Sequence, residues 1–254
     1  MLVNVNGIKL ELDEKRKGID SDLIKNGIRE KFAYYFLMKY LNKDDVVLDI
    51  GANIGYYSLS MSKKVKNVIA CEPVTDNYNR LKNNIRLNKV KNIKTLKIAL
   101  GDTFKYDTIF LNKCCNLCSF NIKSDKGEIV KVSTVDLLNK DYDFNFLRMD
   151  AEGYEFEILK GAEKFLKKDN IRLMIEVHPH LLSDKFSDFV KIIIDNNFKC
   201  DFMAFESKST GFFIKAYQKL RFGIPFVRYD VKDWVRMLDD FYGWCPNVFF
   251  SKKA

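Results

Sequence analysis

The chain has 254 residues, 47% of them hydrophobic, and its 43 Lys and Arg against 34 Asp and Glu give a formal net charge of +9. Its 21 Phe and 12 Tyr can fill a sizeable core, which excludes a disordered chain, and no apolar run approaches the roughly 20 residues of a membrane span. The N-terminal residues alternate polar with apolar and include acids, unlike a secretory signal, so we expect a soluble cytoplasmic protein.

The beginning of the chain predicts a hairpin followed by a single helix. Polar and apolar residues alternate over residues 2–12, and Asn6-Gly7 is a dipeptide typical of a tight hairpin turn. Residues 21–41 then carry apolar side chains at helical spacing. We therefore treat residues 1–41 as an N-terminal hairpin and helix.

Short apolar runs alternate with helical stretches in the rest of the chain. Five such runs are predicted to be strands, at residues 46–50, 67–71, 92–100, 144–149 and 172–177. Each is followed by a helical pattern except the third, which leads into a loop-rich stretch. This alternation indicates a parallel sheet with helices on both faces. Residues 200–205 and 247–253 are expected to close the sheet as a final pair, with an insertion over residues 206–243 between them.

A turn bracketed by glycines follows the first of these strands. Residues 46–59 read VVLDIGANIGYYSL, and Gly51 and Gly55 allow backbone conformations or a close ligand approach that a side chain would forbid. The spacing differs from the G-x-G-x-x-G pattern of dinucleotide sites, and Asp49, two residues before Gly51, would repel a phosphate. A cofactor with a cationic centre and no phosphate fits this turn better.

Acidic residues also stand at the ends of the next two strands. Glu72 follows the second strand, about 20 residues past the turn, where a carboxylate can accept hydrogen bonds from ribose hydroxyls. Asp102 follows the third strand, near the expected position of a base edge. Together with Asp49, these carboxylates would lie along the carboxyl edge of the sheet, where ligands bind in open α/β folds.

These motifs resemble the cofactor motifs of class I S-adenosylmethionine methyltransferases: DIGANIG (49–55), Glu72-Pro73 and Ala99–Asp102. Residues 146–162, FLRMDAEGYEFEILKGA, followed by IEVHP at 175–179, resemble the FkbM family in particular. The resemblance implies a Rossmann-like class I methyltransferase sheet of seven mostly parallel strands with an antiparallel last strand. It also implies O-methylation of sugar or natural-product hydroxyls with S-adenosyl-L-methionine as the cofactor.

The resemblance assigns six residues to cofactor binding: Asp49, Gly51, Asn53, Gly55, Glu72 and Asp102. The residues of the turn would surround the methionine part of the cofactor. Asp49 would orient the turn and bind the amino group, directly or through water. Glu72 would bind the ribose, and Asp102 the adenine amino group.

Four further polar residues mark the edge at which transfer would occur. Strand alternation places Asp150 and Glu152 on one side of their strand end, and Glu176 and His178 likewise on the next strand. Transfer to a hydroxyl needs help with the loss of a proton. Either His178 or Asp150 is a general base while the other carboxylates bind substrate hydroxyls, or all four hold an Mg²⁺-like ion; the metal-free route is favoured.

Three neighbouring ionisable residues are given structural roles. Glu155 and Glu157 are interpreted as acids at a helix entry, where negative charge is favourable to the helix dipole. His180, beside Pro179, is interpreted as a surface residue.

The insertion carries part of the positive charge. It separates a cofactor-binding core, residues 42–205, from a final strand at 244–254 within one domain. Residues 207–228 contain five Lys and Arg, interleaved aromatic residues and no acid. We interpret this segment as a lid; contact with a membrane surface or with an anionic or lipid-linked acceptor is the second interpretation, and RNA the third.

The first functional hypothesis is an O-methyltransferase for a hydroxyl of a sugar, glycan or related small molecule. An RNA methyltransferase with the same cofactor site is the alternative, because residues 72–102 also resemble the corresponding stretch of tRNA methyltransferases. Those that methylate base nitrogens usually carry Asn/Asp-Pro-Pro-Tyr-like residues after the fourth strand, where this chain has Asp150-Ala151-Glu152-Gly153. The glycine spacing disfavours a NAD-dependent oxidoreductase, and the four polar residues at the reacting edge disfavour a non-catalytic nucleotide-binding module.

Overall fold

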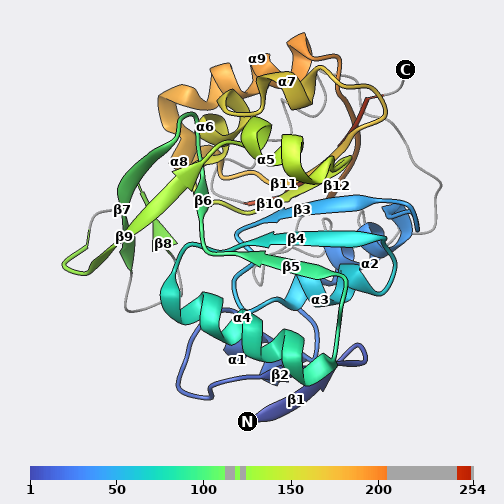
Figure 1. Cartoon of the computed structure of the whole chain (residues 1–254), viewed down its shortest axis with the longest axis vertical. Helices are drawn as coiled ribbons and strands as arrows, with labels where there is room; N and C mark the ends of the chain where they lie inside the picture. The colour runs from blue at the N-terminus through green and yellow to red at the C-terminus, as the bar shows by residue number, and fades with distance from the viewer. Residues whose placement is uncertain (112–117, 121–123, 205–244, 253–254) are drawn as a thin grey trace, which may run out of the picture.

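The structure, a computed structural model, describes residues 1–111, 118–120, 124–204 and 245–252. At its centre is a seven-stranded sheet in the order β12-β13-β11-β10-β3-β4-β5 (Figure 1). Its strands are β3 (Val46–Ile50), β4 (Asn67–Cys71), β5 (Ile93–Leu96), β10 (Phe146–Met149), β11 (Arg172–Glu176), β12 (Lys199–Ala204) and β13 (Asn247–Ser251).

The strand directions confirm the predicted sheet. β3 pairs in parallel with β4 and β10, and the parallel pairing continues to β5 on one side and to β11 on the other. β13 runs antiparallel between β11 and β12, so the last two predicted strands pair as expected. The carboxyl ends of β3, β4, β10 and β11 therefore meet at one edge of the sheet.

Helices cover both faces of this sheet. Figure 1 shows α5 to α9 on one side and α2, α3 and α4 on the other. Successive side chains of β10 point to opposite faces of the sheet and so belong to different hydrophobic clusters. Leu147 packs in the same cluster as Phe189, and Phe146 in the same cluster as Leu37. The helices that follow β3 are α3 (Tyr56–Ser62), α4 (Thr75–Asn88), α5 (Val135–Tyr142), α6 (Glu155–Lys160), α7 (Glu163–Leu166), α8 (Pro179–Leu182) and α9 (Phe186–Asp195), with a short 3-10 turn, η1 (Ser183–Lys185).

The single helix predicted over residues 21–41 is wrong, because this segment forms α1 (Ile19–Asn26) and α2 (Lys31–Tyr40). Gly27 ends α1 in the left-handed conformation, with φ of 66°, and Glu30 precedes α2 with φ of 49°. Both helices bury an apolar face in the same core, so the periodicity continues across the break and does not reveal it.

The described residues between 99 and 133 form a second sheet in the order β6-β9-β7-β8, although a loop-rich stretch was expected after residue 100. The predicted strand 92–100 divides between the two sheets, as β5 and β6 (Ala99–Leu100). The other strands of the second sheet are β7 (Lys105–Leu111), β8 (Cys118–Ser119) and β9 (Gly127–Ser133). α5, which was not predicted either, begins after this sheet at Thr134, whose side chain accepts a hydrogen bond from the Leu137 N–H.

The predicted N-terminal hairpin is confirmed, with β1 (Leu2–Val5) and β2 (Ile8–Glu11) joined at Asn6 and Gly7, whose φ angles are 50° and 74°. The hairpin docks on α4 through side-chain amides. The backbone N–H of Glu11 donates to Asn84 Oδ1, and that of Lys9 to Asn88 Oδ1, both at 2.8 Å.

The predicted insertion at 206–243 lies outside the described residues, and so do the lid and the membrane contact predicted for residues 207–228. Within the described ranges, no helix combines the length and the apolar character that crossing a membrane requires. The division of the chain into four segments stays a prediction.

Candidate functional site

The turn after β3 has the tight conformation that its glycines predict. Gly51, Asn53 and Gly55 all have positive φ, at 75°, 51° and 92°. A Cβ on Gly51 would lie 2.1 Å from the backbone oxygen of Asp150, so only glycine lets the turn pass this close to the end of β10. The Gly51 N–H donates to the last carbonyl of β4 at 3.1 Å, which fixes the turn against that strand.

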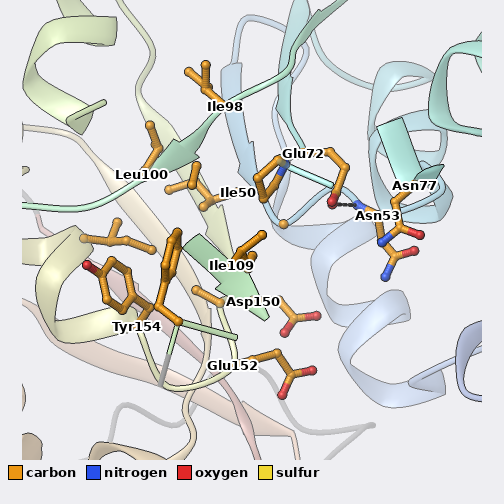
Figure 2. A pocket seen from close by; sticks show the side chains of 16 residues that line it. Ile50, Asn53, Glu72, Asn77, Ile98, Leu100, Ile109, Asp150, Glu152 and Tyr154 are labelled. Carbon is orange, nitrogen blue, oxygen red and sulfur yellow. Dashed lines mark hydrogen bonds between the residues drawn. The ribbon is translucent and has the colours of Figure 1, made fainter. Parts of the chain in front are cut away.

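Glu72 lies directly after β4 and faces this turn (Figure 2). Its carboxylate accepts hydrogen bonds from the backbone N–H groups of Asn53, at 2.8 Å, and Val74, at 3.0 Å. The residue is only 4% exposed, and burial raises its pKa to about 7, although these hydrogen bonds oppose the rise. Two of the predicted cofactor-binding residues, Asn53 and Glu72, are therefore joined directly.

A cavity of about 640 Å³, partly open to solvent, lies against Glu72 and the turn. Its polar lining consists of Asn53, Glu72, Asn77, Asp150 and Glu152. Its apolar lining includes Ile50, Ile98, Ala99, Leu100, Ile109, Phe120, Tyr154 and Ile158. Figure 2 shows Glu72 and Asn53 across the cavity from Leu100 and Tyr154. Oδ1 of Asn53 is buried and has no hydrogen-bond partner among the described residues, so it is available to a ligand. The cavity suits a molecule with a flat, weakly polar ring system and a hydroxylated part.

Asp49 is fully buried and is not among the described residues that line the cavity. It accepts hydrogen bonds from Ser58 and, at 3.3 Å, from Arg148. Arg148 also donates to the Gly51 carbonyl at 3.2 Å and to Asp150 at 3.1 Å. Burial raises the pKa of Asp49, and the charge of Arg148 opposes the rise. Asp49 is thus linked to the turn through Arg148, and its contact with an amino group stays a prediction.

Asp102 is likewise not among the described residues that line the cavity. Its carboxylate is partly exposed and lies 3.8 Å from the Lys160 ammonium. Three apolar residues shortly before Asp102 in the sequence, Ile98 to Leu100, do line the cavity. The assignment of Asp102 to an adenine amino group stays a prediction.

A second cavity, of about 510 Å³, adjoins the first. The two cavities share four lining residues: Gly51, Asn53, Asp150 and Glu152. The rest of the second lining comes from the turn, α3, β10 and the N-terminal segment: Gly18, Ile19, Arg29, Ala52, Tyr56, Tyr57 and Arg148. Its side chains carry both signs of charge, which suits a zwitterionic group.

The sequence did not single out Arg29, Glu30 or Arg148. Arg29 Nε donates to Glu30 Oε1 at 2.6 Å, and the charge of Glu30 raises the pKa of Arg29. Glu30 also accepts hydrogen bonds from the Tyr57 hydroxyl, at 2.7 Å, and from Asn247, at 3.3 Å. Two features of the sequence could have pointed to these residues. Arg29 and Glu30 are adjacent opposite charges within a segment of apolar periodicity, and Arg148 is a charged residue within the apolar strand β10.

The four residues predicted at the reacting edge lie together in the structure. Asp150, Glu152 and His178 each offer one atom within 4.8 Å of the others. Glu176 is 9% exposed and interacts with Asp150. Burial and the charge of Asp150 raise the pKa of Glu152 to about 7 and that of Glu176 well above its usual range. Burial also disfavours the charge on Asp150, but Arg148 holds its pKa below the ordinary value.

Glu155 begins α6, as predicted, and it also binds His178. The Glu155 carboxylate is fully buried, and its Oε1 lies 2.8 Å from His178 Nδ1 and accepts a hydrogen bond from the Gly153 N–H at 3.1 Å. The other ring nitrogen, Nε2, lies 3.4 Å from Glu152 Oε2. Burial disfavours a charged imidazole, but Glu155 raises the pKa of His178 well above its usual value. His180 is exposed, as predicted.

Residues 49–200 match the family model described as Methyltransferase FkbM domain. Hexuronic acid methyltransferase AglP of Haloferax volcanii is 32% identical over 157 residues, which cover 59% of this chain and 62% of that protein. The tRNA (guanine(37)-N(1))-methyltransferase Trm5b of Pyrococcus abyssi is 32% identical over 111 residues, 42% of this chain and 31% of that protein. The chain therefore spans less than two thirds of the length of each of these relatives.

Two solved structures share the arrangement of helices and strands. A methyltransferase FkbM from Methylobacillus flagellatus has a TM-score of 0.52 at 18% identity, over 86% of this chain and 47% of that chain. Trm5b of Pyrococcus abyssi has a TM-score of 0.53 at 14% identity, over 100% of this chain and 56% of that chain. At these identities the likeness establishes a Rossmann-like class I methyltransferase fold and nothing finer. Because the family match covers more than half of the chain and includes the turn, Glu72 and the four residues of the reacting edge, this chain belongs to the FkbM methyltransferase domain family.

Proposed function

We propose that the protein transfers a methyl group from S-adenosyl-L-methionine to a hydroxyl of a sugar, glycan or related small molecule. The observation that carries this proposal is the junction of the two cavities. Asp150 and Glu152 line both cavities and belong to the cluster that also contains Glu176 and His178. A bound cofactor and an acceptor hydroxyl would therefore meet beside groups that can take up a proton.

The residues of the first cavity fit a nucleoside. Glu72 would bind the ribose hydroxyls, since a buried carboxylate is a strong hydrogen-bond acceptor, and the unpartnered Oδ1 of Asn53 would accept a further hydrogen bond. The apolar wall around Leu100 and Tyr154 would hold the base. Asp102 is proposed to reach the adenine amino group from outside this wall.

The residues of the second cavity fit the amino-acid end of the cofactor. Arg29 would attract its carboxylate, and Asp49 is proposed to bind its ammonium group, directly or through water. The turn from Gly51 to Gly55 would surround the methionine chain, and Asp49 would fix that turn through Arg148. The sulfonium group supplies an electrophilic methyl, so that a carbon–oxygen bond forms at the acceptor while the carbon–sulfur bond breaks and its electron pair stays on sulfur.

The carboxylate–imidazole cluster, defined as Asp150, Glu152, Glu176 and His178, is proposed to act on the acceptor. Its oxygen atoms would accept hydrogen bonds from sugar hydroxyls and orient one of them toward the methyl group. The hydroxyl proton would pass to the cluster as the new bond forms, because an alcohol at neutral pH is a weak nucleophile. Glu152 is suited to this role, because its pKa of about 7 lies close to the operating pH.

The named relatives support a sugar acceptor more strongly than an RNA acceptor. AglP, named a hexuronic acid methyltransferase, matches a longer part of this chain than Trm5b does. Trm5b, named a tRNA methyltransferase, favours RNA as the second candidate. The residues at the end of β10, Asp150 to Gly153, lack the prolines of enzymes that methylate base nitrogens, which supports the sugar acceptor.

Replacement of Glu72 tests the cofactor site. We expect Glu72→Ala to weaken S-adenosyl-L-methionine binding, measured by titration calorimetry, about 10- to 100-fold, the range for a lost hydrogen bond to a charged group. Glu72→Gln, which keeps the side-chain size, controls for folding and is expected to lose part of the affinity. Asp102→Ala in the same assay tests the adenine assignment. Unchanged affinity in Glu72→Ala would remove Glu72 from the site.

The acceptor class is tested with a cell extract and methyl-labelled cofactor. We expect the protein to transfer label to the glycan fraction, and Glu152→Gln to reduce the rate at least 10-fold while it leaves cofactor affinity within a factor of about three. Label that appears in the RNA fraction and not in glycan would contradict the proposed acceptor and support the alternative.

A further inference from the structure

The carboxylate–imidazole cluster has the geometry of a metal site as well as of a proton acceptor. The atoms offered by Asp150, Glu152 and His178 lie within 4.8 Å of one another, so one ion between them could contact all three. Their side chains are 20%, 27% and 4% exposed, which leaves room for substrate or water on the open side. Arg148 donates to Oδ2 of Asp150, so this contact leaves the other carboxylate oxygen, Oδ1, for a ligand.

The orientation of His178 supports a ligand on its second nitrogen. Glu155 Oε1 lies 2.8 Å from Nδ1, so Nδ1 keeps its proton, and Nε2, 3.4 Å from Glu152, is the nitrogen that would lose its proton to bind an ion. Metal-binding histidines typically donate their other N–H to a carboxylate in this way, because the contact fixes both the tautomer and the ring orientation. Glu155 is fully buried and also accepts from the Gly153 N–H, so its own position is fixed.

A buried carboxylate beside the three ligands supplies a second, independent observation. Glu176 is 9% exposed, and its Oε2 has no hydrogen-bond donor in the described part of the chain. A hydrogen bond between the two side chains places the Glu176 carboxyl group beside Asp150. A buried carboxyl oxygen without a hydrogen-bond partner is unfavourable unless a proton, a cation or a bound ligand compensates it.

We propose that Asp150, Glu152 and the Nε2 atom of His178 bind one divalent cation, with Glu155 as a positioning residue. Two carboxylates and one imidazole favour a cation that accepts both oxygen and nitrogen ligands, such as Mn²⁺, over one that prefers oxygen alone. An ion here would lower the pKa of a sugar hydroxyl bound to it, which gives the proposed transfer its activated oxygen. The role of the ion in activating the sugar hydroxyl rests on the proposed function, whereas the proposed metal-binding site does not.

The test measures metal binding alone, without cofactor or acceptor. Protein treated with a chelator is titrated with Mn²⁺, and the free ion is followed by electron paramagnetic resonance. We expect one site per chain, with at least 10-fold weaker binding in His178→Ala and Glu152→Gln. Glu155→Gln is expected to weaken binding about 10-fold, within the range for a residue that positions a ligand. Competition with Mg²⁺ and Zn²⁺ then ranks the cations.

Two matched variants keep this test specific. His180→Ala removes the other histidine of the chain, and Glu157→Gln the next acid of α6, which pairs with Lys185; both are expected to bind Mn²⁺ as the unmodified protein does. Because His178 is buried, the partly exposed Glu152→Gln serves as the variant that retains the fold, which thermal unfolding verifies. Equal Mn²⁺ binding in Glu152→Gln and the unmodified protein, or no binding at all, would overturn the site. Cofactor calorimetry is independent of this result, so the failure of one proposal is distinguishable from the failure of the other.

Discussion

Gly51 and Arg148 connect the residues at the junction of the two cavities. Gly51 lets the turn pass against the Asp150 carbonyl, and Arg148 ties the Gly51 carbonyl to the carboxylates of Asp49 and Asp150. Arg148 is 3% exposed, and its guanidinium lies 4.4 Å from the centre of the Tyr57 ring. Burial disfavours its charge, but Asp49 and Asp150 raise its pKa above the ordinary value, so it stays protonated.

Substitution of Gly51 tests how strictly the junction depends on this close approach. We expect Gly51→Ala to lower the free energy of unfolding by about 3–5 kcal/mol, because left-handed strain adds to the clash with Asp150. Gly27→Ala is the matched control: its φ of 66° imposes similar strain, but its Cβ would meet no atom within 4 Å. We expect Gly27→Ala to cost about 1–2 kcal/mol by urea unfolding. Equal losses in the two variants would argue against the clash.

At the scale of elements, the break between α1 and α2 brings the N-terminal segment to the site. Residues 27–30 carry Arg29 into the lining of the second cavity, and Glu30 accepts from Tyr57 on α3. The segment is anchored to α4 by two Arg–Asp pairs. Asp20, fully buried, pairs with Arg80, whereas Arg16 pairs with the exposed Asp76 at 2.7 Å.

These two pairs form a matched comparison of buried and exposed charge. We expect Asp20→Asn to destabilise the protein by about 3 kcal/mol, because it leaves the Arg80 charge without its buried partner. Asp76→Asn, which breaks the exposed pair with Arg16, is expected to cost less than about 1 kcal/mol. Urea unfolding of both variants measures the difference. Similar small losses would mean that Asp20 does not anchor the segment.

At the scale of the whole molecule, stability depends on pH through buried carboxylates at the carboxyl edge of the sheet. Burial raises the pKa of Glu72 from 4.5 to about 7, so the folded state holds a proton that the unfolded state has released in this range. The stability from Glu72 is therefore fully present below pH 4.5 and is lost as pH rises through 7. The shift corresponds to about 3 kcal/mol.

Comparison with Glu72→Gln isolates this contribution. Between pH 5 and 8 we expect the free energy of unfolding of the unmodified protein to fall relative to that of Glu72→Gln by up to about 3 kcal/mol. Glu128→Gln is the control for this pH range: burial raises the Glu128 pKa, but hydrogen bonds from Thr75 outweigh it and lower the pKa below 4.5, so between pH 5 and 8 its profile is expected to parallel that of the unmodified protein. Its contribution is present above the unfolded pKa and is lost as pH falls. A Glu72→Gln profile parallel to that of the unmodified protein over this range would contradict the buried position of Glu72.

Much of the fold followed from the sequence because apolar periodicity reports burial directly. The parallel strands, β12 and β13, and the hairpin at Asn6-Gly7 were predicted from alternation and turn residues. The second sheet was missed because β7, with half-buried residues such as Lys105 and Asp107, has no continuous apolar run. The helix break at Gly27 was missed because both helices bury their apolar faces in one core.

The sequence by itself determined which residue types stand at the strand ends: the glycines of the turn, Glu72, and the acids and histidine after β10 and β11. It could do so because strand ends and tight turns leave local signals in the order of residues. Only the tertiary structure decided how these residues meet, since contacts between distant segments leave no periodicity. In the folded chain Asp49 is buried and hydrogen-bonded to Arg148, and Glu155 is hydrogen-bonded to His178. Asp102 is not among the described residues that line the cavity.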